Sequence, residues 1–298
     1  MSQWSQPAPR GRGAQFRRTL RAPGTRLQKA CPGDGYGTAA RLDRTRIHFC
    51  LAFGSQASNR LFSTHRGKSM QEIRGVVFDL YGTLCDVHSV AQLCGQYFPE
   101  RGTEISLMWR QKQLEYSWLR SLMGQYVSFP QATEDALVFV CNALNLKLRE
   151  DTRIALCNEY LNIKPYREVR SALESLRSAA VPLAILSNGS AHSIQSVVGN
   201  AGIEHFFSHL ISADEVSVSK PSPAAYELAE KSLKVVRSKL LFVSSNAWDA
   251  SGARHFGFRV CWVNRSRNTF EQLGERPDHV ISGLDELPNL LNFASADR

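Results

Sequence analysis

The chain has 298 residues, a length that suits one large domain or two modest ones. Its composition, 43% hydrophobic and 21% charged, is ordinary for a globular protein. The longest apolar runs, at 181–186 and 240–243, are too short to cross a bilayer, so the pattern argues against a membrane protein.

The formal net charge of +9 is concentrated at the N-terminus. Residues 1–70 contain 13 Lys and Arg but only two acidic residues, a charge of +11, so residues 71–298 carry −2. A basic stretch of this kind can bind polyanions non-specifically. The remainder shows no basic stripe, and we expect no nucleic-acid partner for the folded part.

Residues 1–69 are expected to form a disordered basic extension, because they are rich in Gly, Pro, Ser and Arg and show no hydrophobic period. Three explanations remain open: an organelle-targeting peptide, a nucleic-acid-binding arm, or an over-long translation. We favour the last, with the natural start at Met70. Met70 is the only methionine between Met1 and Met108, and it lies three residues before the first credible strand.

From residue 72 onward, short apolar strands alternate with amphipathic helices, which predicts an α/β fold with a Rossmann-like, mostly parallel sheet. The expected strands span 73–78, 181–186, 240–243, 259–263 and 279–281. The expected helices between and after them span 167–179, 191–201, 223–233, 250–256 and 285–294. Ser190 is well placed to cap the helix at 191–201.

The stretch after the first strand is different, because residues 88–164 contain helical runs and no strand-like run. The expected helices span 90–98, 103–123, 131–144 and 151–161. We interpret them as a helical-bundle cap inserted into the sheet domain. The core would then comprise 70–87 and 165–298, and the cap 88–164.

Cysteine usage favours free thiols. The seven cysteines form no Cys-x-x-Cys pair and no Cys/His cluster with zinc spacing. An odd, scattered set is typical of a reducing cytoplasm, so we expect a cytoplasmic protein without disulfides or zinc. These residues are Cys31, Cys50, Cys85, Cys94, Cys141, Cys157 and Cys261.

Polar residues follow three of the expected strands: Asp79, then Ser187 with Asn188, then the segment 244–249. Each alone is best explained as a turn or helix cap. Together they lie at equivalent carboxyl ends of one sheet, where ligands of open α/β sheets bind. Lys220 would reach the same edge, although a single lysine before proline is most often a solvated loop residue.

These residues resemble the four motifs of the haloacid dehalogenase superfamily. The resemblance is carried by Phe-Asp-Leu-Tyr-Gly-Thr-Leu at 78–84, Leu-Ser-Asn-Gly-Ser at 186–190, Lys-Pro at 220–221 and Ser-Ser-Asn-Ala-Trp-Asp at 244–249. Most of that superfamily are magnesium-dependent phosphatases, which gives the alternative function.

Two departures disfavour the phosphatase. Phosphatases of this class carry a second Asp two residues after the nucleophile, where this chain has Tyr81. They also carry a Gly-Asp pair where this chain has Ser244 and Ser245, so only Asp249 remains of the later acidic pair. Magnesium requires several hard oxygen ligands and matching charge. We therefore expect no metal and no cofactor.

Segments 79–87, 109–116 and 242–249 resemble the (S)-2-haloacid dehalogenase type, and the resemblance extends from about Met70 to about Arg265. It implies hydrolysis of (S)-2-haloalkanoic acids to (R)-2-hydroxyalkanoic acids and halide. Asp79 would attack C2 and form an ester, which water then hydrolyses at the Asp79 carbonyl. The family also suggests a homodimer.

The resemblance implies a role for each matching residue. Arg110 and Asn188 would receive the halide, Ser187 the substrate carboxylate, and Lys220 would keep Asp79 ionised. Without the resemblance, two interpretations of Arg110 are about equally good. In the first, Leu107, Leu114 and Trp118 lie beside it on the helix and partly bury its charge, which would then require an anion. In the second, its guanidinium reaches water. Further implied site residues are Thr83 to position Asp79, Asn246 and Asp249 to activate water, Tyr226 and Ser244 at matching positions, and Leu80, Tyr81, Leu114, Phe129 and Trp248 as substrate-binding residues.

Overall fold

The computed structural model describes residues 73–177 and 181–292. The expectations for the extension at 1–69, for a start at Met70 and for Cys31 and Cys50 lie outside the described residues. So do the last residues of the helices expected at 167–179 and 285–294.

The core is a six-stranded sheet in which every pairing is parallel, with strand order β3-β2-β1-β4-β5-β6. The strands are β1 Gly75–Phe78, β2 Leu183–Ser187, β3 His209–Ser212, β4 Leu240–Ser244, β5 Arg259–Val263 and β6 His279–Ile281. The predicted parallel α/β core is confirmed. Phe78 of β1 is in register with Ile185 of β2 and Val243 of β4, so these three strands end at one edge.

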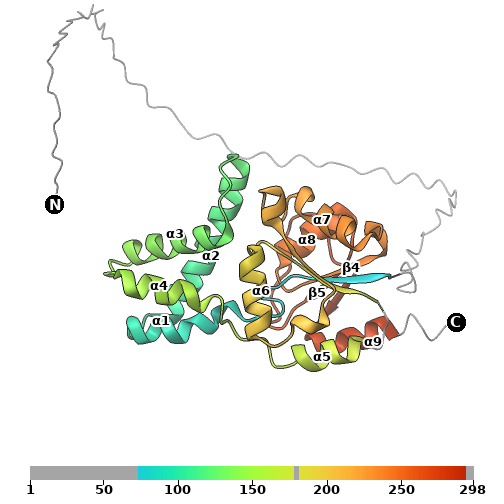
Figure 1. Ribbon diagram of the computed structural model, residues 1–298, viewed down its shortest axis with the longest axis horizontal. Helices are drawn as coiled ribbons and strands as arrows, with labels where there is room; N and C mark the ends of the chain where they lie inside the picture. Colours follow the sequence, from blue (N-terminus) through green and yellow to red (C-terminus); the bar gives the residue numbers. More distant parts are fainter. Residues whose placement is uncertain (1–72, 178–180, 293–298) are drawn as a thin grey trace, which may run out of the picture. The chain divides into compact units, whose positions relative to one another are not determined.

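Helices cover both faces of the sheet, which is why its central strands are continuous apolar runs rather than alternating ones. Along β1, Val76 and Phe78 face one hydrophobic cluster and Val77 faces the other. In Figure 1, α7 and α8 lie on one side of the strands and α5 and α9 on the other. The core helices are α5 Val169–Leu176, α6 Ala191–Asn200, α7 Pro223–Leu233, α8 Ala247–Phe256 and α9 Leu287–Asn292.

The structure corrects two details of the prediction. It adds the edge strand β3, whose first two residues are not buried and whose four residues are too few to show a period. Helix α8 begins at Ala247, not at 250. The predicted cap of α6 is confirmed, because the Ser190 hydroxyl accepts a hydrogen bond from the Ser193 amide at 3.1 Å.

In the described residues, five α-helices separate β1 from β2, and the first four of them lie in the stretch that we interpret as the cap (Figure 1). These four are α1 Ala91–Tyr97, α2 Gly102–Leu122, α3 Phe129–Ala143 and α4 Glu150–Glu159. Helices α2 and α3 are joined through Thr133, which accepts hydrogen bonds from the Trp109 indole at its carbonyl and from the Gln113 amide at its hydroxyl, both at 2.6 Å. Short 3-10 turns complete the chain at η2 Val87–Val90, η4 Glu204–Phe206, η5 Ala213–Val216, η6 Arg237–Lys239 and η7 Leu284–Glu286.

The chain leaves the core and returns to it through two linkers that pair with each other. The Asp86 amide donates to the Lys164 carbonyl at 2.7 Å, and the Tyr166 amide donates to the Leu84 carbonyl at 3.0 Å. The outgoing linker is continuous with the turn that follows β1, so the inserted helices are attached directly beside that turn.

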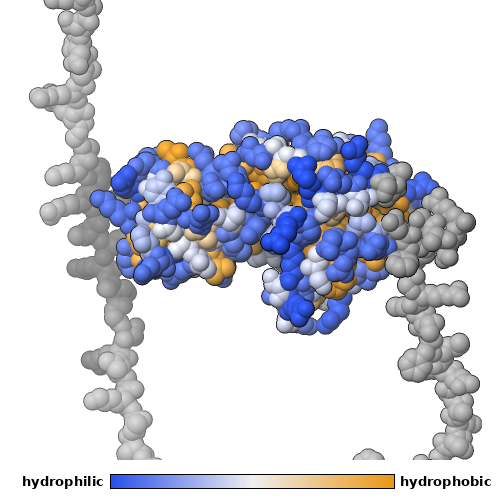
Figure 2. All heavy atoms as spheres, turned by 90° about the horizontal axis from the view of Figure 1, so that it is seen from below, coloured by the Kyte–Doolittle hydropathy of each residue, from blue (hydrophilic) through white to orange (hydrophobic). Residues whose placement is uncertain are grey.

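Within the described ranges, no helix is long and apolar enough to span a membrane. The face drawn in Figure 2 is mostly hydrophilic, with separate hydrophobic patches. The described cysteines are free thiols, as predicted: Cys85, Cys94, Cys141, Cys157 and Cys261.

Candidate active site

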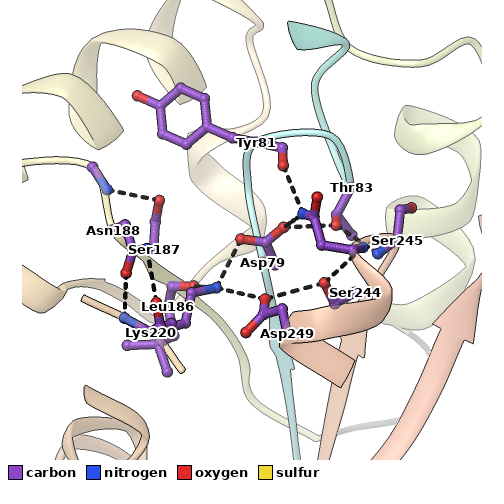
Figure 3. Close-up of polar contacts among 12 residues, drawn as sticks. Asp79, Tyr81, Thr83, Leu186, Ser187, Asn188, Lys220, Ser244, Ser245 and Asp249 are labelled. Atoms are coloured by element: carbon purple, nitrogen blue, oxygen red, sulfur yellow. Dashed lines mark hydrogen bonds and ion pairs between the residues drawn. The ribbon is translucent and has the colours of Figure 1, made fainter. Parts of the chain in front are cut away.

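Asp79 lies directly after β1, and its carboxylate is held by three donors (Figure 3). Its Oδ1 accepts from Lys220 Nζ, and its Oδ2 accepts from Thr83 Oγ1 and Asn246 Nδ2, each at 2.8 Å. The tight turn that brings Thr83 back onto Asp79 passes through Gly82 at a φ of 88°, a conformation that favours glycine. The Asp79 side chain is only 6% exposed, so these neighbours fix the position of its carboxylate.

Lys220 is the central cation of the site. Its ammonium donates to Asp79 Oδ1 at 2.8 Å, to Asp249 Oδ2 at 2.7 Å and to the Leu186 carbonyl at 3.1 Å, which uses all three protons. Burial would lower the pKa of the ammonium, but the two carboxylates outweigh burial and raise that pKa above its ordinary value. Lys220 therefore stays charged.

Asp249 is fully buried in the first turn of α8, where the helix dipole favours an anion. Its carboxylate also accepts from the Tyr226 hydroxyl at 2.7 Å and from the Ser244 hydroxyl at 3.1 Å. Burial raises the pKa of Asp249 to about 6, with a further increase from Asp79, although Lys220 opposes the shift. Two buried carboxylates thus share one ammonium.

The loop after β4 is fastened to the turn after β1. The Ser245 amide donates to Thr83 Oγ1 at 2.8 Å, and the Asn246 side chain donates to the Tyr81 carbonyl at 3.0 Å. The loop is also fixed internally, because Ser244 Oγ accepts from the Asn246 amide at 3.1 Å. Asn246, the donor that reaches Asp79 from the loop after β4, is thus preorganised.

A second edge of the site is formed by the last residue of β2 and the residues that follow it. Ser187 is fully buried, and its Oγ accepts from the Gly189 amide at 3.0 Å. The Asn188 side chain accepts from the Lys220 amide at 2.7 Å, so it positions the lysine loop. Gly189 packs so closely on Tyr81 that an added Cβ would lie 2.9 Å from the ring.

Arg110 reaches the site from α2. It is 8% exposed and donates to the Gln113 side chain at 2.8 Å and to the Tyr81 carbonyl at 3.4 Å. Within the described parts of the chain, no carboxylate forms an ion pair with it. Burial lowers the pKa of its guanidinium, and a buried cation without a counter-ion is a strong site for an anionic ligand.

Asp79, Lys220 and Arg110 meet at a small cavity with about 220 Å³ of empty space, part of which is open to solvent. Its apolar wall includes the Tyr81 and Phe129 rings, whose centroids are 5.0 Å apart. The complete lining is Asp79, Tyr81, Arg110, Leu114, Phe129, Ser187, Asn188, Lys220 and Trp248. Every lining residue belongs to the set predicted from the sequence.

The other predicted site residues do not line this cavity. Thr83, Asn246, Asp249, Tyr226 and Ser244 form the hydrogen-bond network around Asp79 and Lys220 described above. Leu80 does not line the cavity: its side chain is fully buried in the hydrophobic core, and its carbonyl closes the turn after β1 by accepting from the Leu84 amide at 3.0 Å.

One part of the sequence argument was wrong and one contact was missed. Leu107, expected beside a partly buried Arg110, is 55% exposed. Gln113, which orients the Arg110 guanidinium, is fully buried. Its position three residues after Arg110 on the same helix was the available signal.

The residues present do not fit a divalent cation. A tyrosine and a serine occupy the positions of two expected carboxylates, and the Lys220 ammonium already lies between Asp79 and Asp249. Throughout the two described ranges, no group of three or more His, Cys, Asp or Glu residues could hold a metal ion.

The fold and site define a class of α/β protein with a parallel sheet, an inserted helical cap and a buried aspartate directly after the first strand. Residues 73–257 match the family model of haloacid dehalogenase-like hydrolases. The chain belongs to this family.

The similar proteins narrow the class further. The chain is 99% identical over 229 residues to (S)-2-haloacid dehalogenase 2 of Pseudomonas sp. (strain CBS-3), a match that covers 77% of this chain and all of that protein. It is 54% identical to the (S)-2-haloacid dehalogenase of Pseudomonas sp. (strain YL), over 76% of this chain and 97% of that one. The L-2-haloacid dehalogenase of Xanthobacter autotrophicus with chloropropionic acid covalently bound has a TM-score of 0.71 and 39% identity, covering 74% of this chain and 98% of that one.

Proposed function

We propose that this enzyme hydrolyses (S)-2-haloalkanoic acids to (R)-2-hydroxyalkanoic acids and halide through an ester of Asp79. The observation that supports this most strongly is the pairing of charges across one cavity. An aspartate held by the Lys220 ammonium faces the same 220 Å³ space as Arg110, a buried cation without a carboxylate partner. The nucleophile and the acceptor of an anionic leaving group are therefore both present.

In the first step, an Asp79 oxygen attacks C2 of the substrate from the side opposite the halogen. The C–O bond forms as the C–halogen bond breaks, and the halide leaves with the bonding electron pair toward Arg110 and Asn188. Halide is a competent leaving group and needs no proton. Because no proton is needed, the position where phosphatases carry an acid can be occupied by Tyr81. Attack from the side opposite the halogen inverts the configuration at C2.

In the second step, water attacks the ester carbonyl of Asp79. The bond between that carbonyl carbon and the ester oxygen breaks, which regenerates the carboxylate and leaves the 2-hydroxy acid. The proton lost by water passes to Asp249 and the product oxygen gains one in return. Asp249, with a pKa of about 6, suits this role, and Asn246 orients the ester.

The remaining contacts fit a small 2-haloacid. Ser187, at the end of β2, would bind the substrate carboxylate, close to the positive charge of Lys220. Tyr81, Leu114, Phe129 and Trp248 would enclose the alkyl group. The phosphatase alternative has no such support, because the donor set described above does not suit magnesium.

The test is halide release from each enantiomer of 2-chloropropionate, with a chelator present. We expect release from the (S)-enantiomer only, unaffected by the chelator, and no release from Asp79→Asn. Asp151→Asn, a change at an exposed carboxylate, is the matched control. A single turnover in heavy-oxygen water should label Asp79. Chelator-sensitive phosphate release, or label in the product alone, would contradict the proposal.

We further propose a cytoplasmic homodimer, with the core at 70–87 and 165–298 and the cap at 88–164. Free thiols support the cytoplasm. Exposed large hydrophobic residues on and near α2 and α3 support a dimer surface: Leu119, Leu122, Met123, Val138 and Phe139. Leu122→Asp is expected to give a monomer by light scattering, and an unchanged mass would contradict this surface.

A further inference from the structure

Four parts of the active-site scaffold meet at Arg265, which lies outside the set of residues predicted to act in the reaction. Its Nη2 donates to the Thr83 carbonyl at 2.9 Å, its Nη1 to Ser245 Oγ at 2.8 Å and its Nε to Glu168 Oε1 at 2.7 Å. The guanidinium also packs on the Tyr166 ring, 3.9 Å from the centroid. One side chain therefore joins the loops after β1, β4 and β5 to the segment before α5.

Two of the residues that Arg265 contacts, Thr83 and Ser245, are connected to Asp79 by hydrogen bonds or by the neighbouring residue. Ser245 and Thr83 are bonded to each other, and Thr83 Oγ1 donates to Asp79 Oδ2 at 2.8 Å. Asn246, the residue after Ser245, donates to the same oxygen at 2.8 Å. The distance between the loops after β1 and β4 thus decides whether Thr83 and Asn246 both reach Asp79. Arg265 bridges these two loops by donating to the Thr83 carbonyl and to Ser245 Oγ.

The other two contacts anchor the guanidinium. Tyr166 and Glu168 lie where the chain returns from the inserted helices. The Tyr166 amide itself donates to the Leu84 carbonyl. The Arg265 and Glu168 side chains are 18% and 24% exposed, so their ion pair is partly shielded from solvent. Burial would raise the pKa of Glu168, but backbone hydrogen bonds and Arg265 outweigh it and lower that pKa.

We propose that Arg265 is a positioning residue for the dehalogenation, which holds Thr83 and Ser245 together so that Thr83 and Asn246 both point at Asp79 Oδ2. This inference rests on the proposed function. The role requires the planar fork of a guanidinium, whose separate N–H groups reach two acceptors and Glu168 at once. A lysine ammonium could keep the ion pair but could not span both loops.

The test compares Arg265→Lys and Arg265→Met with the unchanged enzyme, by halide release from (S)-2-chloropropionate and by thermal unfolding. We expect kcat to fall about 10- to 100-fold in both variants, because small misplacement of reacting groups is costly. KM should stay within about twofold, because the residues that line the cavity are unchanged. Arg265→Lys should regain most of the unfolding temperature that Arg265→Met loses, without regaining kcat.

Arg259→Met is the matched control, because Arg259 is 17% exposed and pairs with Asp278 away from the site. It should leave kcat unchanged. Should Arg265→Met fail to fold, Arg265→Lys and Ser245→Ala replace it, and kcat must fall in both. A kcat that Lys restores, or one equal to that of the unchanged enzyme, overturns the positioning role. If the unchanged enzyme releases no halide, the proposed function itself fails.

Discussion

Lys220 Nζ lies 2.7 Å from Asp249 Oδ2, and the two side chains are 1% and 0% exposed. The same ammonium is shared with Asp79 at 2.8 Å. A single cation thus neutralises two buried carboxylates that differ in role, the proposed nucleophile and the proposed base. Removing the cation would leave two like charges close together in a buried site without a counter-ion.

We therefore expect Lys220→Met to lower the free energy of unfolding by about 3–5 kcal/mol, the usual cost of removing one partner of a buried ion pair. Adding Asp249→Asn should recover part of this loss, because it removes one of the two unpaired charges. Urea denaturation measures both changes. Lys231→Met, which removes an exposed pair with Glu227, should cost at most about 0.5 kcal/mol. Equal losses in the two lysine variants would contradict the shared-cation interpretation.

The pKa of Asp249, raised from 3.8 to about 6, predicts the pH dependence of turnover. Below pH 6 Asp249 is protonated and cannot accept a proton, so kcat should fall as the pH decreases through this value. The folded protein holds this proton more tightly than the unfolded chain does. Ionisation of Asp249 therefore removes stability as the pH rises from about 4 to about 6.

Tyr226→Phe tests that assignment. The Tyr226 hydroxyl donates to the ionised carboxylate of Asp249 and so lowers its pKa. Its removal should shift the acidic limb of the kcat profile to higher pH. A limb that stays in place, or moves to lower pH, would mean that another group controls it.

Arg110→Met should lower kcat by about 10²- to 10³-fold, because it removes the cation that we propose receives the leaving halide. The free energy of unfolding should not decrease, since the variant removes a buried charge without a carboxylate partner and keeps much of the apolar stem. Arg120→Met, which breaks a partly exposed pair with Asp135 on the inserted helices, is the control and should keep kcat. Halide release and urea denaturation give the two readouts.

Phe129→Ala should broaden the range of substrates. Tyr81 and Phe129 line both the active-site cavity and a larger neighbouring groove, so a smaller side chain at 129 would connect the two spaces. We expect kcat/KM for 2-chlorohexanoate, relative to 2-chloropropionate, to rise by about tenfold. Leu107→Ala, at an exposed position of α2, should leave the ratio unchanged. An unchanged ratio in Phe129→Ala would show that this ring does not limit chain length.

The sequence pattern predicted five of the six strands of the described sheet. Strands β5 and β6 and helix α7 have the predicted bounds, because apolar runs or proline and lysine at the ends delimit them. Strand β3 was missed, since a half-exposed edge strand needs few apolar residues.

The candidate site was predictable to the extent that its residues follow strands. Asp79, Ser187 and Lys220 are visible as motifs, and the resemblance added Arg110. The contacts of Arg265 were not foreseen, because they depend on the meeting of segments far apart in the chain: Thr83 is 182 residues from Arg265. The contact of Gln113 with Arg110 is local, three residues along one helix, and was overlooked.

The paired linkers at Asp86 and Lys164 give the inserted helices only two covalent junctions with the sheet, side by side. The insertion is therefore one continuous segment of chain. Its exchange between related enzymes would replace Arg110, Leu114 and Phe129 at the same time. The aspartate, its lysine and the β4 loop would remain on the sheet. An exchange would therefore change the proposed halide acceptor and part of the wall around the alkyl group together, whereas Asp79 would keep its place.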